Sequence, residues 1–371
     1  MKNAYETDLL VIGGGAAGLC AAAEAAAAGA AAAGAKVTVI ESDLHPGGQL
    51  VKQTHKFFGS KDEYAGTRGY KIADILLGEI EALGDKVNIS CNSTVTGYYP
   101  EDGLFTVMEG EDDYYRVKAK KTVIATGAQE RMIPFTNNDL PGVYGAGAVQ
   151  TLMNVYGVVP GKKVVMVGAG NIGLIVSYQL RQAGVDVVAV VEAMPQIGGY
   201  WVHAAKIRRL GIPILLRHTV TKAVGDKVLE GAVIQELDDK FQLIGEPKKI
   251  DCDIICMAVG LTPTTELFWQ AGCKMQFVPQ LCGYVPFRDK TMRTSNPDIW
   301  VAGDASGIEE ASAAMVEGRI AGHSAAKALG LPVDDKRFGE YWERLHHLRA
   351  GEVGQKITAG VNQVLVDKWE A

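Results

Sequence analysis

The chain has 371 residues, of which 44 are glycine and 47% are hydrophobic, and its formal net charge at pH 7 is −6. That length is enough for two or more domains with separate cores, and the glycine content favours an α/β protein with many tight turns. The acidic balance gives no electrostatic reason to expect nucleic acid or an anionic membrane as a partner, and no stretch reaches the roughly 18 apolar residues of a membrane span.

A dinucleotide-binding unit is predicted at the start of the chain. An apolar strand leads into Gly13, Gly15 and Gly18, an alanine-rich helix follows, and a second strand at residues 37–40 ends in Glu41. In such units the first glycine allows a tight turn, the second lets the backbone approach a pyrophosphate, and the third lets helix and strand pack closely. Free N–H groups at the helix N-terminus favour the anion, and Glu41 would accept hydrogen bonds from a ribose.

The helix of this unit contains a tandem duplication. The sequence AAAAG occupies residues 25–29 and again residues 30–34. Either the helix is about 7 Å longer than usual at 1.5 Å per residue, or it ends at Gly29 and the surplus forms a longer connection. Because the duplication follows the phosphate turn, we expect deletion of residues 30–34 to leave cofactor binding intact.

A loop, a helix and a small antiparallel insertion are predicted next. Proline and glycine in HPGG indicate the loop, and residues 70–83 have helical periodicity. One further buried strand at residues 122–125 ends at Thr126 and Gly127. The insertion is predicted from four strand-like runs, residues 87–90, 93–99, 104–109 and 114–119, with EDG as a hairpin signal.

The opening pattern returns in the middle of the chain. A strand leads into Gly168, Gly170 and Gly173, a helix covers about residues 171–182, and a second strand ends in Glu192. The third glycine and the acid are 19 residues apart here and 23 apart in the first unit, so the duplication is visible by internal comparison. An acid at this position favours NAD over NADP, because a 2′-phosphate would meet a like charge. Another adenine nucleotide, or a second unit that binds nothing, is the alternative.

A third informative stretch lies at residues 294–304. It predicts an apolar strand that ends in Gly303 and Asp304, and a helix of small residues follows. A carboxylate and a helix N-terminus would then lie at the carboxyl edge of a sheet, where such folds bind ligands.

Three motifs in this order carry a resemblance to a known family. GGGAAG with Glu41, ATG at residues 125–127 and VAGD at residues 301–304 resemble the FAD-binding set of the thioredoxin-reductase-like and pyridine-nucleotide disulfide oxidoreductases. The resemblance covers nearly the whole chain. It implies FAD as the cofactor and an α/β fold with two Rossmann-like domains, the second inserted in the first, with a small antiparallel β insertion.

The resemblance also implies site residues, among them Asp304 at the ribityl chain and Val95 near the adenine. The implied FAD site comprises Gly13, Gly15, Ala16, Ala17, Gly18, Glu41, Ser42, Gly47, Gly48, Gln49, Leu50, Thr54, Val95, Ala125, Thr126, Gly127, Gly303, Asp304 and Ala311. The second site, for NAD(H) or another adenine nucleotide, comprises Gly168, Gly170, Asn171, Ile172, Gly173, Glu192 and Gly260.

The cysteines depart from the pattern of the disulfide reductases in this family. Six cysteines are scattered without a CxxC pair, so a dithiol relay is not expected. Cys252 and Cys256 are predicted to be buried free thiols on one face of a strand. Neither a metal site nor a catalytic residue is predicted. The cysteine usage and the lack of a signal-peptide pattern favour a reducing compartment, the cytoplasm.

A closer resemblance points to multi-subunit enzymes. LPGVYGAGAVQTLMN, VEAMPQIGGYWVHAAKIRRLGIPIL and residues 294–322 are similar to flavoprotein subunits of amino-acid dehydrogenases: opine oxidase, hydrogen cyanide synthase, D-hydroxyproline and L-proline dehydrogenase, and the sarcosine oxidase large subunit. Such subunits often carry a cysteine-rich iron-sulfur module, but no cysteine follows Cys282 here. The implied partners are a second flavoprotein subunit that oxidises the substrate and a small iron-sulfur subunit.

The order of motifs predicts the domains. The FAD domain is split into residues 1–140 and 263–330, an NAD-type domain occupies residues 141–262, and residues 331–371 form a helical tail that docks on a partner or packs on the chain's own core.

Three functional hypotheses follow. The first is an electron-transfer subunit of an amino- or imino-acid dehydrogenase that moves electrons between FAD and NAD or another acceptor. The alternatives are a stand-alone NADH-dependent reductase of a small redox protein and an assembly scaffold with structural nucleotides. Hydride transfer between nicotinamide and flavin is cofactor chemistry, so the lack of a catalytic triad is compatible with the first two.

Overall fold

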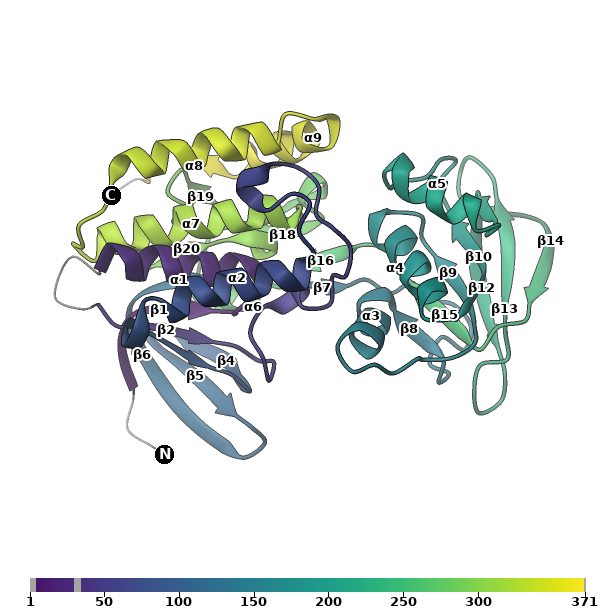
Figure 1. The fold of residues 1–371 in the computed structure, drawn as a ribbon, viewed down its shortest axis with the longest axis horizontal. Helices are drawn as coiled ribbons and strands as arrows, with labels where there is room; N and C mark the ends of the chain where they lie inside the picture. Colours follow the sequence, from purple (N-terminus) through teal and green to yellow (C-terminus); the bar gives the residue numbers. More distant parts are fainter. Residues whose placement is uncertain (1–4, 30–34, 370–371) are drawn as a thin grey trace. The chain divides into compact units, whose positions relative to one another are not determined.

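The computed structural model describes residues 5–29 and 35–369, and the chain divides into two compact units (Figure 1). Unit 1 contains the chain up to Gln129 and again from Thr262, and unit 2 is Glu130–Leu261. The predicted insertion of one Rossmann-like domain in the other is thus confirmed as a fold. The functional domain limits at residues 140 and 262 stay predictions.

The main sheet of unit 1 has seven strands. They are β1 (Tyr5–Ile12), β2 (Val37–Ile40), β3 (Val87–Ser90), β4 (Ser93–Tyr99), β5 (Leu104–Glu109), β6 (Asp113–Ile124) and β20 (Ile299–Val301). Their order is β3-β2-β1-β6-β5-β4, with β20 paired to β6. The pairs β3–β2, β2–β1, β1–β6 and β6–β20 are parallel, whereas β5 pairs with β6, and β4 pairs with β5, in antiparallel orientation. The order reverses between β1 and β6, which is where open α/β sheets bind ligands.

One long strand joins the parallel and antiparallel parts of this sheet. The sequence predicted two strands, at residues 114–119 and 122–125, but β6 is continuous. Its first half pairs with β5 and its second half with β1 and β20. Lys120 and Lys121 lie between the two predicted runs and offer no turn residue. Their ammonium groups pair with Asp8 and Asp298 at 2.7 and 2.5 Å, so the strand carries its charges at the surface and continues.

Unit 1 also contains helices, some of which pack on other helices and not on the sheet. They are α1 (Ala16–Gly29), α2 (Gly69–Glu81), α6 (Glu266–Gln270), α7 (Ala311–Ala328), α8 (Asp335–Leu348) and α9 (Glu352–Val361), with 3₁₀ turns at η1 (Gly48–Leu50), η2 (Lys61–Glu63), η3 (Gly84–Lys86), η4 (Pro279–Leu281) and η5 (Gly303–Ser306). The helix predicted at residues 70–83 is confirmed as α2. Figure 1 shows α1, α7 and α8 side by side within this unit.

Small residues bring α1 and α7 into close contact. A Cβ on Gly318 would lie 2.1 Å from Ala17 O, and one on Gly322 would lie 2.2 Å from Ala21 O. Both clashes are with backbone atoms, which cannot rotate away. The alanine content of α1 thus has a packing role, because it lets α7 approach the helix that follows the first glycine turn.

The C-terminal segment packs on the core of unit 1. Tyr341 and Leu345 of α8 are buried in the main hydrophobic cluster, and Val361 and Val364 are buried in a smaller one. Glu24 of α1 is 3% exposed and accepts hydrogen bonds from Arg337 and Tyr341 at 2.9 and 2.7 Å. The buried side of this tail therefore belongs to unit 1, and docking on a partner through its exposed side stays a prediction.

Short strands complete unit 1 and the passages between the units. They are β17 (Met275–Val278) with β18 (Gly283–Pro286), β19 (Arg288–Asp289) with β21 (Leu365–Val366), and, at the two crossings of the chain, β7 (Ala128–Glu130) and β16 (Leu261–Pro263).

Unit 2 is built on a five-stranded parallel sheet. Its strands are β8 (Val143–Gly145), β9 (Lys163–Val167), β10 (Asp186–Glu192), β11 (Ile214–Leu216) and β15 (Ile254–Met257), in the order β11-β10-β9-β15-β8. Its helices are α3 (Ala146–Asn154), α4 (Asn171–Gln182) and α5 (Trp201–Arg209), and a separate antiparallel sheet holds β12 (His218–Val224), β13 (Gly231–Leu237) and β14 (Leu243–Ile250). The order of the parallel sheet reverses between β9 and β15.

Two expectations from the sequence meet different outcomes here. Cys252 and Cys256 are buried free thiols as predicted, but they do not share a face. They belong to different hydrophobic clusters, because the strand begins only at Ile254 and the alternation rule does not extend back to Cys252. The second AAAAG block, residues 30–34, lies outside the described residues, so the two predicted forms of the duplication remain open.

Within the described part of the chain, no helix combines the length and apolar character that crossing a membrane requires.

Candidate dinucleotide sites

The first glycine turn connects β1 to α1, and two of its glycines are required by the fold itself. Gly13 has a φ of 101°, and a Cβ there would lie 2.4 Å from Ala125 O. A Cβ on Gly18 would lie 1.8 Å from Gly13 O. These positions admit only glycine because any side chain would strain or displace the backbone.

Gly15 is different. Its φ lies outside the left-handed region, and among the described residues a Cβ would meet only Gly48 Cα within 4 Å, at 3.9 Å. The protein therefore leaves room for a side chain just before the first residue of α1. The first N–H groups of a helix have no partner inside the helix and attract an anion. The fold itself does not require glycine at this position. The lack of a side chain here is consistent with a ligand pyrophosphate that approaches the backbone.

The acid at the end of β2 is held against this turn. Glu41 is 5% exposed, and its Oε2 accepts the Gly14 N–H at 2.6 Å. Its Oε1 accepts the Asp43 N–H at 2.7 Å and the Ser42 hydroxyl at 3.2 Å. The carboxylate is thus fixed at the edge of the turn, where the sequence places a ribose. The ribose contact itself stays a prediction.

The HPGG loop lies across the same turn. Gly47 N–H donates to Gly14 O at 2.8 Å, and a Cβ on Gly48 would lie 2.8 Å from Gly15 Cα. Gln49 is exposed, whereas the Leu50 side chain is buried in the core. Any contact of Leu50 with a cofactor would therefore use its backbone.

The ends of β6 and β20 complete this edge of the sheet. Ala125 N–H donates to Ile12 O at 2.8 Å, and Ala302 N–H donates to Ile124 O at 3.2 Å. The Thr126 hydroxyl donates to Thr264 O at 2.8 Å, and Gly127 has a φ of 70°.

The remaining predicted FAD residues are distributed around this edge. A Cβ on Gly303 would lie 2.8 Å from Ala17 Cβ, and Ala311 begins α7. Ser93 N–H donates to Glu41 O at 2.9 Å, which brings the start of β4, the strand that contains Val95, to the end of β2. Thr54 lies farther along the loop, where its carbonyl accepts a hydrogen bond from Arg68.

Asp304 is a strongly perturbed acid at this edge. Burial raises its pKa to about 7, and the nearby Glu317 and Glu309 charges act in the same direction. The Glu309 N–H, 3.4 Å from Oδ1, opposes the shift. Near neutral pH this side chain can therefore act as a hydrogen-bond donor or acceptor.

A buried ion cluster supports the Asp304 segment. Glu317, 2% exposed, accepts the Gly303 N–H at 3.1 Å and the Ser306 hydroxyl at 2.7 Å through Oε2. Its Oε1 accepts Arg349 at 2.7 Å, and Arg349 also pairs with Glu309 at 2.5 Å. Buried charges persist where they are paired and hydrogen-bonded.

Sequence reasoning missed this cluster, which also includes the buried Arg288 beside Ser306 O at 3.0 Å. One signal was available: Glu317 is a single acid inside a helix of small residues. Its partner Arg349, from the C-terminal segment, had no local signal because the contact spans 32 residues.

The second glycine turn, in unit 2, repeats the first. Gly168 has a φ of 105°, and a Cβ there would lie 2.3 Å from Ala258 O. A Cβ on Gly173 would lie 2.1 Å from Gly168 O. Glu192 Oε2 accepts the Ala169 N–H at 2.7 Å, and its Oε1 accepts the Met194 N–H at 2.9 Å. Each contact has its counterpart in unit 1.

Gly170 is the counterpart of Gly15. No atom of the described residues lies within 4 Å of a Cβ built there, and the residue caps the N-terminus of α4. Ile172, in the first turn of this helix, is 37% exposed, and Gly260, after β15, has a φ of 113°. The second turn therefore also offers a helix N-terminus with unused space in front of it.

A second double-glycine loop covers this turn. The N–H groups of Gly198 and Gly199 donate to Ala169 O at 3.2 and 2.9 Å, and Asn171 Oδ1 accepts the Tyr200 N–H at 2.8 Å. A spacing signal was present. In each unit the first glycine of the loop follows the acid by six residues.

Three of the cysteines are buried thiols of low reactivity. Burial raises the pKa of Cys20 to about 11 and that of Cys252 to about 12, and it also raises the pKa of Cys256. Thiols of this kind react slowly because the thiolate is the nucleophile. Among residues 5–29 and 35–369 no group of three or more His, Cys, Asp or Glu side chains is placed to hold a metal ion.

Comparison with known proteins shows the family. The family model described as pyridine nucleotide-disulphide oxidoreductase matches residues 7–318. The fold is similar to the crystal structure of T. acidophilum thioredoxin reductase, with a TM-score of 0.69 and 24% identity over 87% of this chain and 98% of that chain.

Two curated relatives are subunits of larger enzymes. A subunit of opine oxidase from Agrobacterium tumefaciens (strain Ach5) is 30% identical over 87% of this chain, and the alpha subunit of sarcosine oxidase from Corynebacterium sp. (strain P-1) is 28% identical over 88%. The chain spans 66% of the first relative and 33% of the second. The resemblance identified from the motifs is confirmed: the chain belongs to the pyridine nucleotide-disulphide oxidoreductase family and is an FAD-dependent oxidoreductase.

Proposed function

We propose that the chain is the electron-transfer flavoprotein subunit of a heteromeric amino- or imino-acid dehydrogenase, and that it moves electrons between FAD and NAD or another acceptor. One observation carries the proposal. Each of the two units has a helix-starting glycine, Gly15 or Gly170, whose Cβ the protein could accommodate. Each glycine turn therefore has space for a ligand beside the N-terminus of its helix, and two such turns in one chain support the binding of two dinucleotides.

The first turn would hold FAD. The pyrophosphate would lie before α1 beside Gly15, the ribose at Glu41 and the ribityl chain at Asp304. When bound, FAD exchanges a hydride with a nicotinamide. The residues of the chain would bind and orient the cofactor, and the Glu317 and Arg349 pair would keep the Asp304 segment in place.

The second turn would hold NAD(H). Glu192 is fixed by two backbone N–H groups, as Glu41 is, and its carboxylate would accept the ribose hydroxyls of NAD. A 2′-phosphate would bring a second negative charge to the same place. We therefore expect NADH to be preferred to NADPH.

The substrate would be oxidised elsewhere. The relatives are named as subunits of opine oxidase and sarcosine oxidase, and this chain spans only part of their length. We assign oxidation of the amino or imino acid to a second flavoprotein subunit, whereas a small third subunit would hold an iron-sulfur centre. The buried cysteines support this division, since they offer no reactive dithiol for an alternative relay. The cytoplasm is the proposed location.

The test is anaerobic rapid mixing of the purified chain, with its flavin bound, against NADH, NADPH and a panel of opines, sarcosine and proline. We expect NADH to bleach the visible absorption band of the flavin with a larger second-order rate constant than NADPH does. The amino acids should leave this band unchanged. Adding the co-purified native partners should then make flavin reduction depend on one amino-acid class.

The outcomes separate the alternatives. Turnover of an amino acid by this chain alone would contradict the division of labour. A flavin that neither NADH nor the partners reduce would indicate the scaffold. Full activity toward a small redox protein without any co-purifying subunit would indicate the stand-alone reductase.

A further inference from the structure

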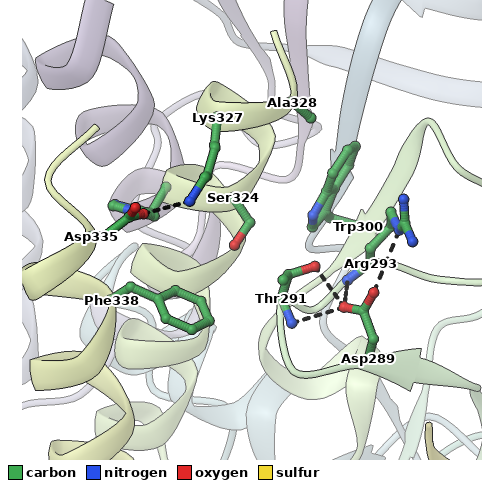
Figure 2. A pocket seen from close by; sticks show the side chains of 10 residues that line it. Asp289, Thr291, Arg293, Trp300, Ser324, Lys327, Ala328, Asp335 and Phe338 are labelled. Carbon is green, nitrogen blue, oxygen red and sulfur yellow. Dashed lines mark hydrogen bonds and ion pairs between the residues drawn. The ribbon is translucent and has the colours of Figure 1, made fainter. Parts of the chain in front are cut away.

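A cavity of about 350 Å³ opens in unit 1 between the C-terminal half of α7, the start of α8 and the segment that joins β19 to β20. Figure 2 shows Lys327, Asp335 and Phe338 on the helical side and Thr291 and Trp300 on the other. This volume is within the range of small-molecule sites. The cavity is separate from the candidate FAD site: Ala311 and Lys327 are 16 residues apart on α7, a rise of about 24 Å.

Three buried nitrogen atoms belong to side chains that line this cavity and lack a hydrogen-bond partner among the residues that the structure describes: Arg293 Nε, Trp300 Nε1 and His323 Nε2. The first of them has an ion-pair contact with Asp289 Oδ2, at 3.4 Å. Trp300 and His323 are each 2% exposed. In Figure 2 the indole nitrogen of Trp300 lies on the edge of the ring that faces the space toward Ser324. A buried polar group without a partner is unfavourable, so each such group calls for an explanation.

The chemistry of these atoms limits the ligand. An indole N–H can only donate, so Trp300 requires an acceptor. His323 Nδ1 lies 3.7 Å from Glu24 Oε1, and its Nε2 lies 3.8 Å from Asp335 Oδ1, beyond hydrogen-bond distance. An acceptor oxygen in the cavity would satisfy the indole and lie close to the imidazole.

Charged side chains favour a single negative charge. Lys327 Nζ lies 2.6 Å from Asp335 Oδ1, and Arg293 Nε lies 3.4 Å from Asp289 Oδ2. An ammonium has three donors and a guanidinium five, so one carboxylate does not exhaust either cation. The two aspartates would repel a dianion such as phosphate, whereas a carboxylate carries one charge and two acceptor oxygens.

We propose that this cavity binds a small carboxylate ligand. One carboxylate oxygen accepts the Trp300 N–H, and the other lies toward the ammonium of Lys327. Phe338 and Ala328 give the hydrocarbon part of the ligand an apolar wall. The site does not depend on the electron-transfer proposal, because no residue of either glycine turn contributes to it.

The test follows the indole N–H signals of the full, flavin-loaded chain by ¹H–¹⁵N TROSY NMR. The chain has five tryptophans, and Trp300→Phe and Trp269→Phe identify two of the five signals. Trp269 is 51% exposed on α6 and is an internal reference. Sodium acetate, glycine and sodium sulfate are titrated at constant ionic strength; acetate is a plain carboxylate and glycine a zwitterion.

We expect acetate, glycine or both to shift the Trp300 signal saturably while the Trp269 signal stays in place and sulfate has no effect. Lys327→Gln should raise the carboxylate Kd at least threefold. Lys336→Gln, at an 82% exposed site on α8, should leave it unchanged. A Trp300 signal that does not move with either carboxylate, that moves equally with sulfate, or that responds identically in the two lysine variants would overturn the proposal. If Trp300→Phe does not fold, deletion of the other four signals by single Phe variants still assigns it.

Discussion

Asp304 is the residue at the candidate FAD site whose protonation the fold changes strongly. Its pKa is raised from the usual value of 3.8 to about 7, chiefly by burial. Between these values the folded, flavin-free chain binds one proton more than the unfolded chain does. The free energy of unfolding therefore contains a contribution from Asp304 that is full below about pH 4 and is lost as the pH rises through about 7.

The predicted loss of stability with rising pH can be tested. In the flavin-free chain Asp304→Asn removes the titration, so the stability of the variant relative to the parent should increase by about 1–3 kcal/mol between pH 5 and pH 7.5. Urea unfolding at four pH values measures the difference in the free energy of unfolding between the variant and the parent. Asp298→Asn, at an exposed carboxylate of the neighbouring segment, should show a constant difference. A constant difference for Asp304→Asn as well would mean that burial does not perturb this acid.

At the scale of single residues, the sequence predicts some residues of the candidate site and misses others for a physical reason. Gly13, Gly18 and Glu41 could be predicted because their roles depend on neighbours within one strand-turn-helix-strand unit. Glu317 and Arg349 could not, because their pairing depends on how the C-terminal segment returns to α7. Local geometry leaves a pattern in the sequence, whereas a contact between distant segments leaves only a single unexplained charge.

Among the elements, the α1 and α7 pair connects packing to the site. Gly318 and Gly322 let α7 lie against the backbone of α1, and α7 begins beside the Asp304 segment. Gly318→Ala should lower the free energy of unfolding by about 1–3 kcal/mol, since its Cβ would lie 2.1 Å from Ala17 O. Thermal unfolding of the flavin-free chain, with its flavin affinity measured in parallel, tests this.

The matched control lies in the neighbouring helix. Gly339, in α8, is exposed, and a Cβ there would have no atom of the described residues within 4 Å. Gly339→Ala should therefore stabilise the chain by about 0.5–1 kcal/mol through helix propensity alone. Equal effects of the two substitutions would show that close approach of α1 and α7 does not constrain Gly318.

Most element positions could be predicted because the hydrophobic period and the turn residues agree in β3, β4, β5, α2 and α4. The exception, β6, is instructive. Its two apolar runs are separated by Lys120 and Lys121, which predict an interruption by charge alone. The chain continues through them because the pairing of β6 with β1 runs from Val117 to Ile124, across both lysines, and this pairing outweighs local polarity.

At the scale of the whole molecule, the two units share five features. Each glycine turn begins with a glycine of positive φ, which lies against the carbonyl of the residue that follows the neighbouring strand. Each turn also has a glycine packed against the first one, an acid whose carboxylate accepts a backbone N–H of the turn, and a double-glycine loop that lies across it. Internal contacts explain these features in both units, with one exception: a Cβ on Gly198 would make only an ordinary contact, 3.8 Å from Gly170 Cα. Internal contacts do not explain Gly15 and Gly170 either, because each could carry a Cβ without a clash.

These two glycines allow the two sites to be tested independently. Gly15→Ala should leave the thermal stability of the flavin-free chain unchanged within about 0.5–1 kcal/mol, yet lower the FAD content of the purified protein at least tenfold, because the new methyl occupies the pyrophosphate space. Gly170→Ala should keep FAD content normal and raise at least tenfold the NADH concentration that half-saturates flavin reduction.

The control variants are Gly18→Ala and Gly173→Ala, whose Cβ atoms would lie 1.8 and 2.1 Å from backbone oxygens. Both should destabilise the chain even without ligand. If Gly15→Ala destabilised the flavin-free chain as much as Gly18→Ala, the open space would be a feature of folding. If it left FAD content unchanged, the cofactor would not approach the backbone there.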